Sequence, residues 1–321
     1  MSTIRTILAL LIALMAVPVF GQEDATPQPA AVAFSEIFDQ GVALFDAQQF
    51  EQAILRFDLF LLFNPTAGET YYATALSHLN LGDQAAALVD FENALAIDAL
   101  PPNLEADIYR VRAGIYGQSE RLDDAISDYS AALELVPDAQ TYFRRAMVYT
   151  ALNQVGAALT DFDSALELDG QNPVLYVYRG YVYSTNGDLE LAAEDYSTYI
   201  DLIQTERTEG APLVSGAAVT AQLAPGTVIA YPLSVKTGTY FSGVALSTDA
   251  ATTIDTLMVL LDETGKPLIA DDDSGNNGAA LVLNFEIPSD GDYTLLVANS
   301  TGGGSGQIAV QMFLSEEPLT N

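Results

Sequence analysis

The feature that most constrains the fold of this chain is a pattern that occurs five times, with a spacing close to 34 residues between copies. Each copy divides into two stretches of helical periodicity, joined by a short turn such as NLGD (80–83) or TNGD (185–188). The first stretch carries one small residue, at Gly41, Ala75, Ala113, Ala146 and Gly180. The second carries an alanine followed four residues later by an aromatic, at Phe57, Phe91, Tyr129, Phe162 and Tyr196. Because helices approach closely only where side chains are short, this pattern predicts five stacked helix pairs.

The repeat resembles the tetratricopeptide repeat in its period and its residue types, over about residues 34–206. One departure is that the chain has no tryptophan, and the usual tryptophan position holds Ile37, Tyr71, Tyr109, Tyr142 and Tyr176. A second departure is His78, which stands where an aromatic is usual. The resemblance implies an all-α superhelical solenoid with a concave inner face that binds a protein or peptide.

That family resemblance also places the inner face on four positions of each first helix. The side chains there form a mainly apolar set: Phe38, Val42, Phe45, Tyr72, Leu76, Leu79, Arg110, Phe143, Met147, Val174, Val177 and Tyr181. We expect a groove that takes an apolar or aromatic peptide segment, with one acidic contact at Arg110. The alternative is that Phe38, Phe45 and Tyr72 are covered by neighbouring helices or by the residues before them.

Arginine and aspartate also occur at equivalent repeat positions. Arg112, Arg145 and Arg179 each precede the small residue of the first helix. The position before the second-helix aromatic holds Asp90, Asp128, Asp161 and Asp195. This pattern predicts an ion pair between packed helices, bidentate where the geometry allows. The alternative is a stripe of arginines that binds anions.

The sequence changes character after about residue 206, where glycine, threonine, serine and valine become frequent. Runs typical of strands are separated by the turn signals APG, KTG, ETGK, PSDGD and STGGGSG. The predicted strands are residues 218–223, 227–235, 239–246, 256–263, 280–287, 293–300 and 306–314. This spacing predicts an antiparallel, jelly-roll-like β-sandwich over residues 218–316, joined to the repeats by a linker at 207–217.

The sandwich resembles the bacterial pre-peptidase C-terminal domain over about residues 215–315. Leu260, Asp262, Gly265 and Leu268 match that family's "L-x-D-x-x-G-x-x-L" pattern. Its "G-x-Y-x-L-x-V" strand is matched by Gly291, Tyr293, Leu295 and Val297. The resemblance implies an accessory module that attaches a secreted protein to a surface or a polymer.

The acidic loop DDDSGNNG (271–278) is the candidate metal site. Asp271, Asp273 and Asn276 supply the hard oxygen ligands that calcium prefers. The loop lacks the bidentate glutamate of the helix–loop–helix calcium site, and strands flank it. The alternative is a solvated, Asp-rich turn; no other cofactor is indicated.

The N-terminus resembles a secretory signal peptide at residues 1–21. Arg5 precedes an apolar run over 7–17, Pro18 ends that run, and Val19 and Gly21 are small enough for signal peptidase. Residues 22–33 are polar and Pro-rich and are expected to form a flexible leader. We therefore expect an exported protein, periplasmic, cell-surface or extracellular, with no membrane span left after cleavage; an uncleaved anchor is the alternative.

Composition narrows the classes of function. The net charge of −32 disfavours nucleic acid and anionic lipid as partners. With no cysteine and one histidine, thiol catalysis and Ser–His–Asp or Cys–His arrangements lack support. His78 is expected to pack at the helix crossing, and repeats and sandwich together leave no catalytic domain.

Two functions remain. The first is an exported, non-enzymatic adaptor whose repeats bind a protein and whose sandwich fixes the assembly to a surface, a polymer or another subunit. The second is a self-associating structural module of an envelope complex. Both need a cover for the last repeat, since solenoid ends expose apolar surface. We expect the sandwich, or a partner chain, to provide that cover.

Overall fold

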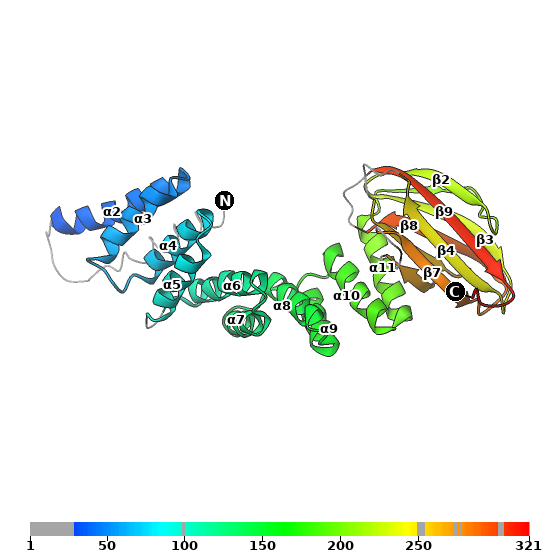
Figure 1. Ribbon diagram of the computed structural model, residues 1–321, viewed down its shortest axis with the longest axis horizontal. Helices are drawn as coiled ribbons and strands as arrows, with labels where there is room; N and C mark the ends of the chain where they lie inside the picture. Colours follow the sequence, from blue (N-terminus) through cyan, green and yellow to red (C-terminus); the bar gives the residue numbers. More distant parts are fainter. Residues whose placement is uncertain are drawn as a thin grey trace, which may run out of the picture. The chain divides into compact units, whose positions relative to one another are not determined.

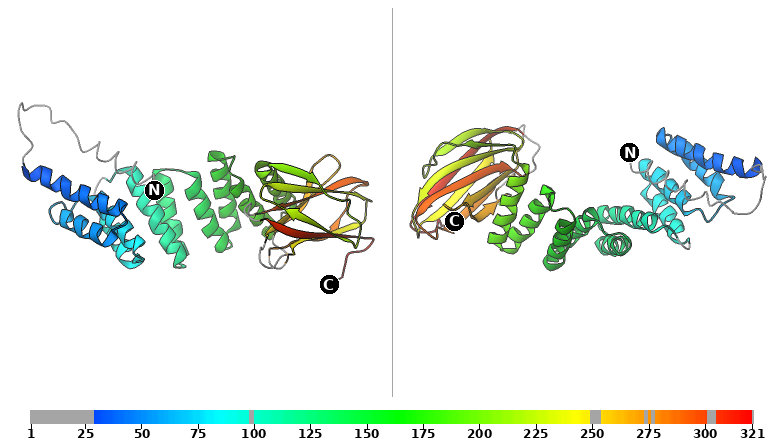
Figure 2. Two further views of the ribbon diagram at one scale, coloured as in Figure 1. Left: turned by 90° about the horizontal axis from the view of Figure 1, so that it is seen from above. Right: turned by 180° about the vertical axis from the view of Figure 1, so that it is seen from behind.

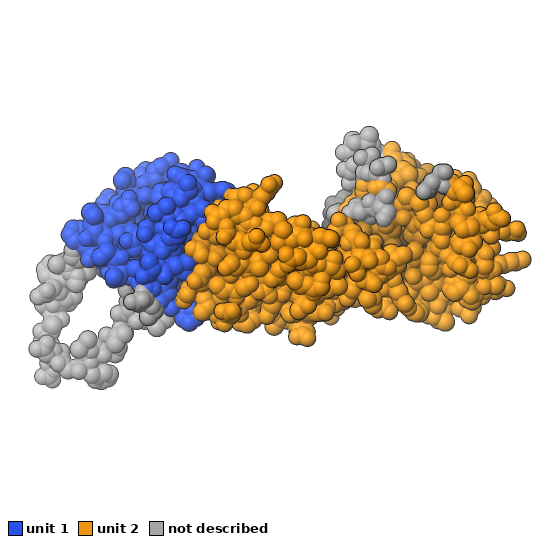
Figure 3. All heavy atoms as spheres, turned by 60° about the horizontal axis from the view of Figure 1, so that its bottom comes forward, with its two compact units in different colours: residues 1–104 blue, residues 105–321 orange. Residues whose placement is uncertain are grey.

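The computed structural model describes residues 29–97, 100–248, 254–272, 275, 278–300 and 305–320, with side chains from residue 35 onward. The chain divides into two compact units, residues 1–104 and 105–321 (Figure 3). The expected signal peptide at residues 1–21 lies outside the described residues. Among those residues, the helices fall short of the length and apolar character that crossing a membrane requires.

The helices come in pairs, in the order that the repeat pattern predicts (Figure 1). The first unit contains α2 (Pro29–Asp46), α3 (Phe50–Leu61), α4 (Gly68–Asn80) and α5 (Gln84–Leu95). The chain passes into the second unit within α6 (Pro102–Gln118), which pairs in sequence order with α7 (Leu122–Leu135). There follow α8 (Ala139–Ala151), α9 (Val155–Leu168), α10 (Pro173–Asn186) and α11 (Leu189–Ile203). The described residues thus hold the ten helices of an all-α tetratricopeptide-type solenoid.

Small residues let the two helices of a pair meet, as the pattern predicts. Gly41 of α2 lies so close to Phe57 of α3 that an added Cβ would stand 2.6 Å from the ring. At Gly180 of α10, an added Cβ would stand 3.2 Å from the ring of Tyr196. Both aromatic rings are fully buried. The aromatic therefore occupies the space that the missing side chain leaves at each crossing.

In the C-terminal part of the second unit, the described residues form nine strands in two sheets. One sheet has the order β1-β3-β8-β5-β6, and the other has the order β2-β9-β4-β7. The strands are β1 (Glu206–Glu209), β2 (Ala218–Leu223), β3 (Thr227–Val235), β4 (Tyr240–Ser247), β5 (Thr256–Leu261), β6 (Pro267–Asp271), β7 (Ala280–Glu286), β8 (Gly291–Asn299) and β9 (Gly306–Ser315). Every pairing is antiparallel except that of β1 with β3. Apolar side chains of both sheets fill the space between them, which confirms the sandwich.

The five-stranded sheet is also buried over part of its second face, where α11 packs against it (Figure 2). Tyr199 and Ile200 of α11 pack with Leu257 of β5 and Leu296 of β8. All six residues of β5 are consequently buried. The expectation that the sandwich covers the last repeat is therefore confirmed.

The boundaries differ from the expected ones in three places. Helix α2 begins at Pro29, inside the expected leader. Residues 206–209, which span the expected boundary between the repeats and the linker, form β1 and pair in parallel with Thr227–Ala230. Leu213, within the same segment, is buried in the sandwich core. The segment after α11 is thus held to the sandwich by backbone hydrogen bonds and apolar packing.

Candidate interaction site: an arginine ladder and an apolar groove

Three arginines make the same pair of bonds in three successive helix pairs. Arg112 donates through Nε and Nη2 to the two carboxylate oxygens of Asp128, at 2.6 and 2.7 Å. Arg145 binds Asp161 with both distances at 2.7 Å. Arg179 does the same to Asp195, at 2.8 and 2.7 Å. We call these residues the arginine ladder, and they confirm the predicted bidentate pair between the helices of a repeat.

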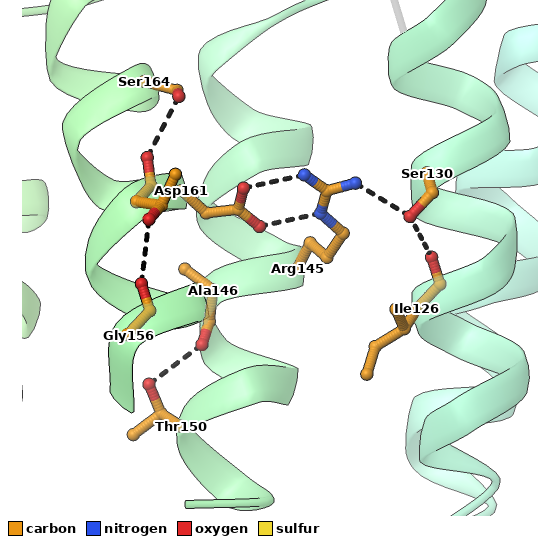
Figure 4. A network of polar contacts seen from close by, with 9 residues as sticks. Ile126, Ser130, Arg145, Ala146, Thr150, Gly156, Asp161 and Ser164 are labelled. Carbon is orange, nitrogen blue, oxygen red and sulfur yellow. Dashed lines mark hydrogen bonds and ion pairs between the residues drawn. The ribbon is translucent and has the colours of Figure 1, made fainter. Parts of the chain in front are cut away.

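The ladder also connects successive repeats. The remaining nitrogen of Arg145 donates to Ser130 Oγ at 2.8 Å, and Ser130 in turn donates to the carbonyl of Ile126 (Figure 4). Arg179 reaches back to Asp163 of α9 at 2.6 Å. The guanidinium groups of Arg145 and Arg179 are thus bonded on two sides by their own chain, which leaves them little capacity for an external anion.

Tyrosine rings stand beside each ladder arginine. The Arg145 guanidinium carbon lies 5.8 Å from the ring centres of both Tyr142 and Tyr149. The same arrangement recurs around Arg112 with Tyr109 and Tyr116, and around Arg179 with Tyr176 and Tyr183. In these three repeats, the tyrosine that replaces the family's tryptophan is therefore one of two rings that make a cation–π contact with the ladder arginine.

In the first unit, a histidine takes the place of the ladder arginine as the partner of the aspartate. The position equivalent to the ladder arginine is Thr74, whose hydroxyl donates to the carbonyl of Thr70. Asp90 is instead bonded at 2.8 Å to Nδ1 of His78. Burial raises the pKa of Asp90, and the His78 hydrogen bond opposes that rise. His78 thus serves an interhelix contact, as its repeat position indicates.

The expected groove residues of the first unit are mostly within its core. Phe38 and Tyr72 are less than a tenth exposed and pack beside Phe57 and Phe91 respectively. Val42 and Phe45 contact the same core, and Phe45 meets Phe50 edge-on. The remaining expected members, Leu76 and Leu79, are half-buried. In this unit, therefore, Phe38 and Tyr72 contribute more to packing than to an open surface.

In the second unit, two expected groove residues are likewise engaged in packing. Arg110 donates to Asp107 at 2.7 Å, to Thr141 at 2.9 Å and to the Val136 carbonyl at 2.8 Å. Phe143 meets the rings of Phe162 and Tyr178 edge-on. Arg110 is therefore already bonded to acidic and carbonyl oxygens of its own chain.

The structure brings Met147 and Tyr181 together in a pocket of 510 Å³. Val177 and Val174 line it too, respectively one and two turns before Tyr181 on the same face of α10. Val174 is 45% exposed and Tyr181 is 38% exposed. This is the part of the expected inner face that remains open in the second unit, and we call it the junction pocket.

The far wall of the junction pocket comes from the sandwich. Asp255, Asp272 and Ser300 line it there, with Tyr199 and Ile203 of α11 between the two walls. Tyr199 donates to the carbonyls of Asn299 and Ser300, at 3.0 and 2.6 Å. Sequence reasoning missed this wall because no local pattern reports contacts between residues about a hundred positions apart.

The structure describes one of the three expected calcium ligands. Asp271 is buried, and its carboxylate accepts a hydrogen bond from the backbone nitrogen of Leu281 at 2.7 Å. Asp273 and Asn276 lie outside the described residues. Within the described ranges, no three His, Cys, Asp or Glu side chains gather as a metal site would require. Calcium binding by this loop stays a prediction.

Comparisons with known proteins bear on the repeats. The tetratricopeptide repeat family model matches residues 38–103, 111–173 and 143–207. No curated protein sequence matches the chain.

Solved structures resemble the chain over about half its length. MamA from Desulfovibrio magneticus RS-1 is 18% identical, with a TM-score of 0.47 over 55% of this chain and 97% of that one. YrrB, described as a TPR protein with an unusual peptide-binding site, is 19% identical, with a TM-score of 0.48 over 55% of this chain and 93% of that one. PilF of Pseudomonas aeruginosa is 16% identical, with a TM-score of 0.44 over 54% of this chain and 78% of that one.

The family assignment rests on the sequence match and on the helix pairs, independently of those structures. The matched ranges cover α3 to α11 almost without a gap. The small-residue crossings recur within them at the family's spacing. The chain belongs to the tetratricopeptide repeat family, whose stacked helix pairs are interaction modules for proteins and peptides.

Proposed function

We propose that this protein is an exported, non-enzymatic adaptor that binds an apolar peptide segment of a partner protein against the first helices of its repeats. The observation that carries the proposal is the junction pocket, in which Val174, Val177 and Tyr181 present an apolar stripe beside Met147. Exposed apolar side chains that line a concavity together are typical of a binding surface, whereas scattered ones are not. The stripe has the spacing i, i+3 and i+7, with which a helical segment also presents the apolar side chains that it docks into a groove.

A pair of substitutions tests this function. Val174→Asp places a charge in the pocket wall at a side chain that is 45% exposed, so the fold should tolerate it. The matched control is Leu189→Asp, which changes a side chain that is 42% exposed at the first turn of α11 and outside the pocket. Peptides selected on the chain from a random dodecapeptide display library should bind Val174→Asp at least about tenfold more weakly, and Leu189→Asp unchanged. If both variants bind the peptides equally well, the groove is not the surface that binds them.

The accessory role belongs to the sandwich. Its resemblance to the pre-peptidase C-terminal domain supports attachment of the adaptor to a surface or polymer outside the cytoplasm. The signal-like N-terminus supports export to the periplasm, the cell surface or the medium.

Self-association as a structural module is the second candidate. Leu55, Leu62 and Phe63 in and after α3 are more than 60% exposed, which is unusual for large apolar side chains. Light scattering over a dilution series separates the two functions. A homo-oligomer that persists at submicromolar concentration, and that Leu62→Ser disperses, favours the structural module.

A further inference from the structure

One end of the five-stranded sheet forms the polar wall of the junction pocket. The strand register pairs Thr256 with Asn299 and Met258 with Asp271. Each of these strands ends beside one polar residue, so the same end of the sheet carries Asp255, Asp272 and Ser300. We call this end of the sheet the acidic edge. All three line the pocket opposite the apolar stripe of α10.

Hydrogen bonds fix this acidic edge relative to the repeats. Tyr196 of α11 donates to Asp272 Oδ1 at 2.7 Å, and Tyr199 donates to the carbonyl oxygens of Asn299 and Ser300. Both tyrosines are buried. The apolar wall and the acidic wall therefore form one preorganised site, which lowers the conformational cost of binding.

The charge of the pocket has one sign. Asp255 and Asp272 line it, and the described residues around the pocket include no lysine, arginine or histidine. Burial raises the pKa of Tyr199, which also lines the pocket, to about 12, and the negative charge of nearby Asp255 adds to that rise. An apolar wall that leads to a carboxylate is complementary to a side chain with an aliphatic stem and a cationic head.

We propose that the junction pocket receives a lysine or arginine side chain of the bound peptide segment. The stem lies along Val177 and Tyr181, and the cation meets the edge that carries Asp255 and Asp272. This inference rests on the proposed peptide-binding function and adds its specificity: an apolar segment with one basic residue. The repeats supply affinity, and the sandwich, through its acidic edge, selects the sequence.

The experiment uses the full chain and peptides selected from the random dodecapeptide library. Each selected peptide is synthesised in two forms, with its basic residue and with norleucine in that position. Titration calorimetry is then carried out with the unchanged chain, Asp255→Asn, and the control Glu317→Gln, an exposed acid outside the pocket. We expect Asp255→Asn to weaken the basic peptide about tenfold, to leave the norleucine peptide unchanged and to reduce the salt dependence of binding. Glu317→Gln should change none of these.

The outcomes separate the two proposals. Selected peptides that are apolar and show no excess of lysine or arginine overturn the basic-residue inference, while their sensitivity to Val174→Asp retains the peptide-binding function. A basic peptide that binds Asp255→Asn as tightly as the unchanged chain overturns the inference as well. Selection that yields no peptide sensitive to Val174→Asp overturns both. The melting temperature of each variant shows that a loss of binding is not a loss of fold.

Discussion

At the scale of single residues, the ladder arginines join packed helices through ion pairs that are largely buried. Arg145 has 17% of its side chain exposed and Asp161 has 4%, so their charges are largely removed from water. The hydrogen bonds to Asp161 raise the pKa of Arg145, which keeps it charged at any pH the fold meets. A buried pair of this kind contributes little beyond an apolar pair of the same volume, but loss of one partner leaves a buried charge without compensation.

Arg145→Met should therefore lower the free energy of unfolding by about 3–5 kcal/mol. Adding Asp161→Leu to it removes the stranded carboxylate and should recover most of that loss. Urea denaturation of both variants measures the difference. A single variant that unfolds like the unchanged chain, with only anion binding reduced, would return the ladder to the anion-binding interpretation.

Tyr199 predicts a specific response to alkaline pH. Its pKa is raised to about 12 by burial and by Asp255, above the value of about 10 expected in the unfolded chain. Between these values the unfolded state releases the Tyr199 proton and the folded state keeps it, so this tyrosine's contribution to stability is complete below pH 10 and is lost as pH rises toward 12. Tyr199→Phe should show a smaller fall in melting temperature from pH 10 to 12 than the unchanged chain. An equal fall in both would show that other tyrosines set the alkaline limit.

Local repetition explains which residues could be predicted from the sequence. Arginine and aspartate at equivalent positions predicted the ladder, because a stacked repeat reproduces the same contact in each copy. Of the flanking tyrosines, Tyr109, Tyr142 and Tyr176 were identified only as tryptophan replacements. Asp255 and Ser300 gave no signal, because they join Tyr181 only through the contact between α11 and the sheet, which occurs once in the chain and has no period.

At the scale of elements, helices and long strands followed from periodicity, whereas two short strands did not. Strand β6 has five residues and lies between two turn signals. Strand β1 is ERTE, mostly polar and exposed, and it is held in the sheet by its parallel partner β3, in which Glu206 pairs with Thr227. One signal was present but not used: β5 contains the continuous apolar run LMVLL, and such a run indicates a strand buried on both faces.

A pair of glycines tests the turn chemistry. Gly187 ends α10 with a φ of 89°, a left-handed conformation that costs a residue with a Cβ about 1–2 kcal/mol. Gly187→Ala should therefore destabilise by about 1 kcal/mol. Gly117, within α6, has ordinary helical backbone and open space around it, so Gly117→Ala should stabilise by up to about 1 kcal/mol. Thermal unfolding of the two variants should show shifts of opposite sign; shifts of the same sign would contradict the assignment of Gly187 as the helix cap.

At the scale of the whole molecule, the second unit joins two kinds of architecture through one apolar layer. The sequence predicted that the last repeat needs a cover but did not predict which face of the sandwich supplies it. The answer lies in the five-stranded sheet, whose outer face is apolar at Leu257, Val259, Leu296 and Ala298. An ordinary sandwich presents polar side chains there. The outer face is therefore suited to α11, and the two parts should unfold together.

Leu257→Ala tests that coupling, because Leu257 is fully buried in the layer between α11 and the sheet. A cavity there should cost about 2–5 kcal/mol. If the layer makes one cooperative unit, native-state hydrogen exchange should show the same loss of protection in α10 and α11 as in β5 and β8. Phe313→Ala, which changes a side chain that is 39% exposed in β9, is the control and should alter protection little in either part. Loss of protection confined to the strands would show that the last repeat is stable without its cover, and that α11 does not hold the acidic edge of the junction pocket in place.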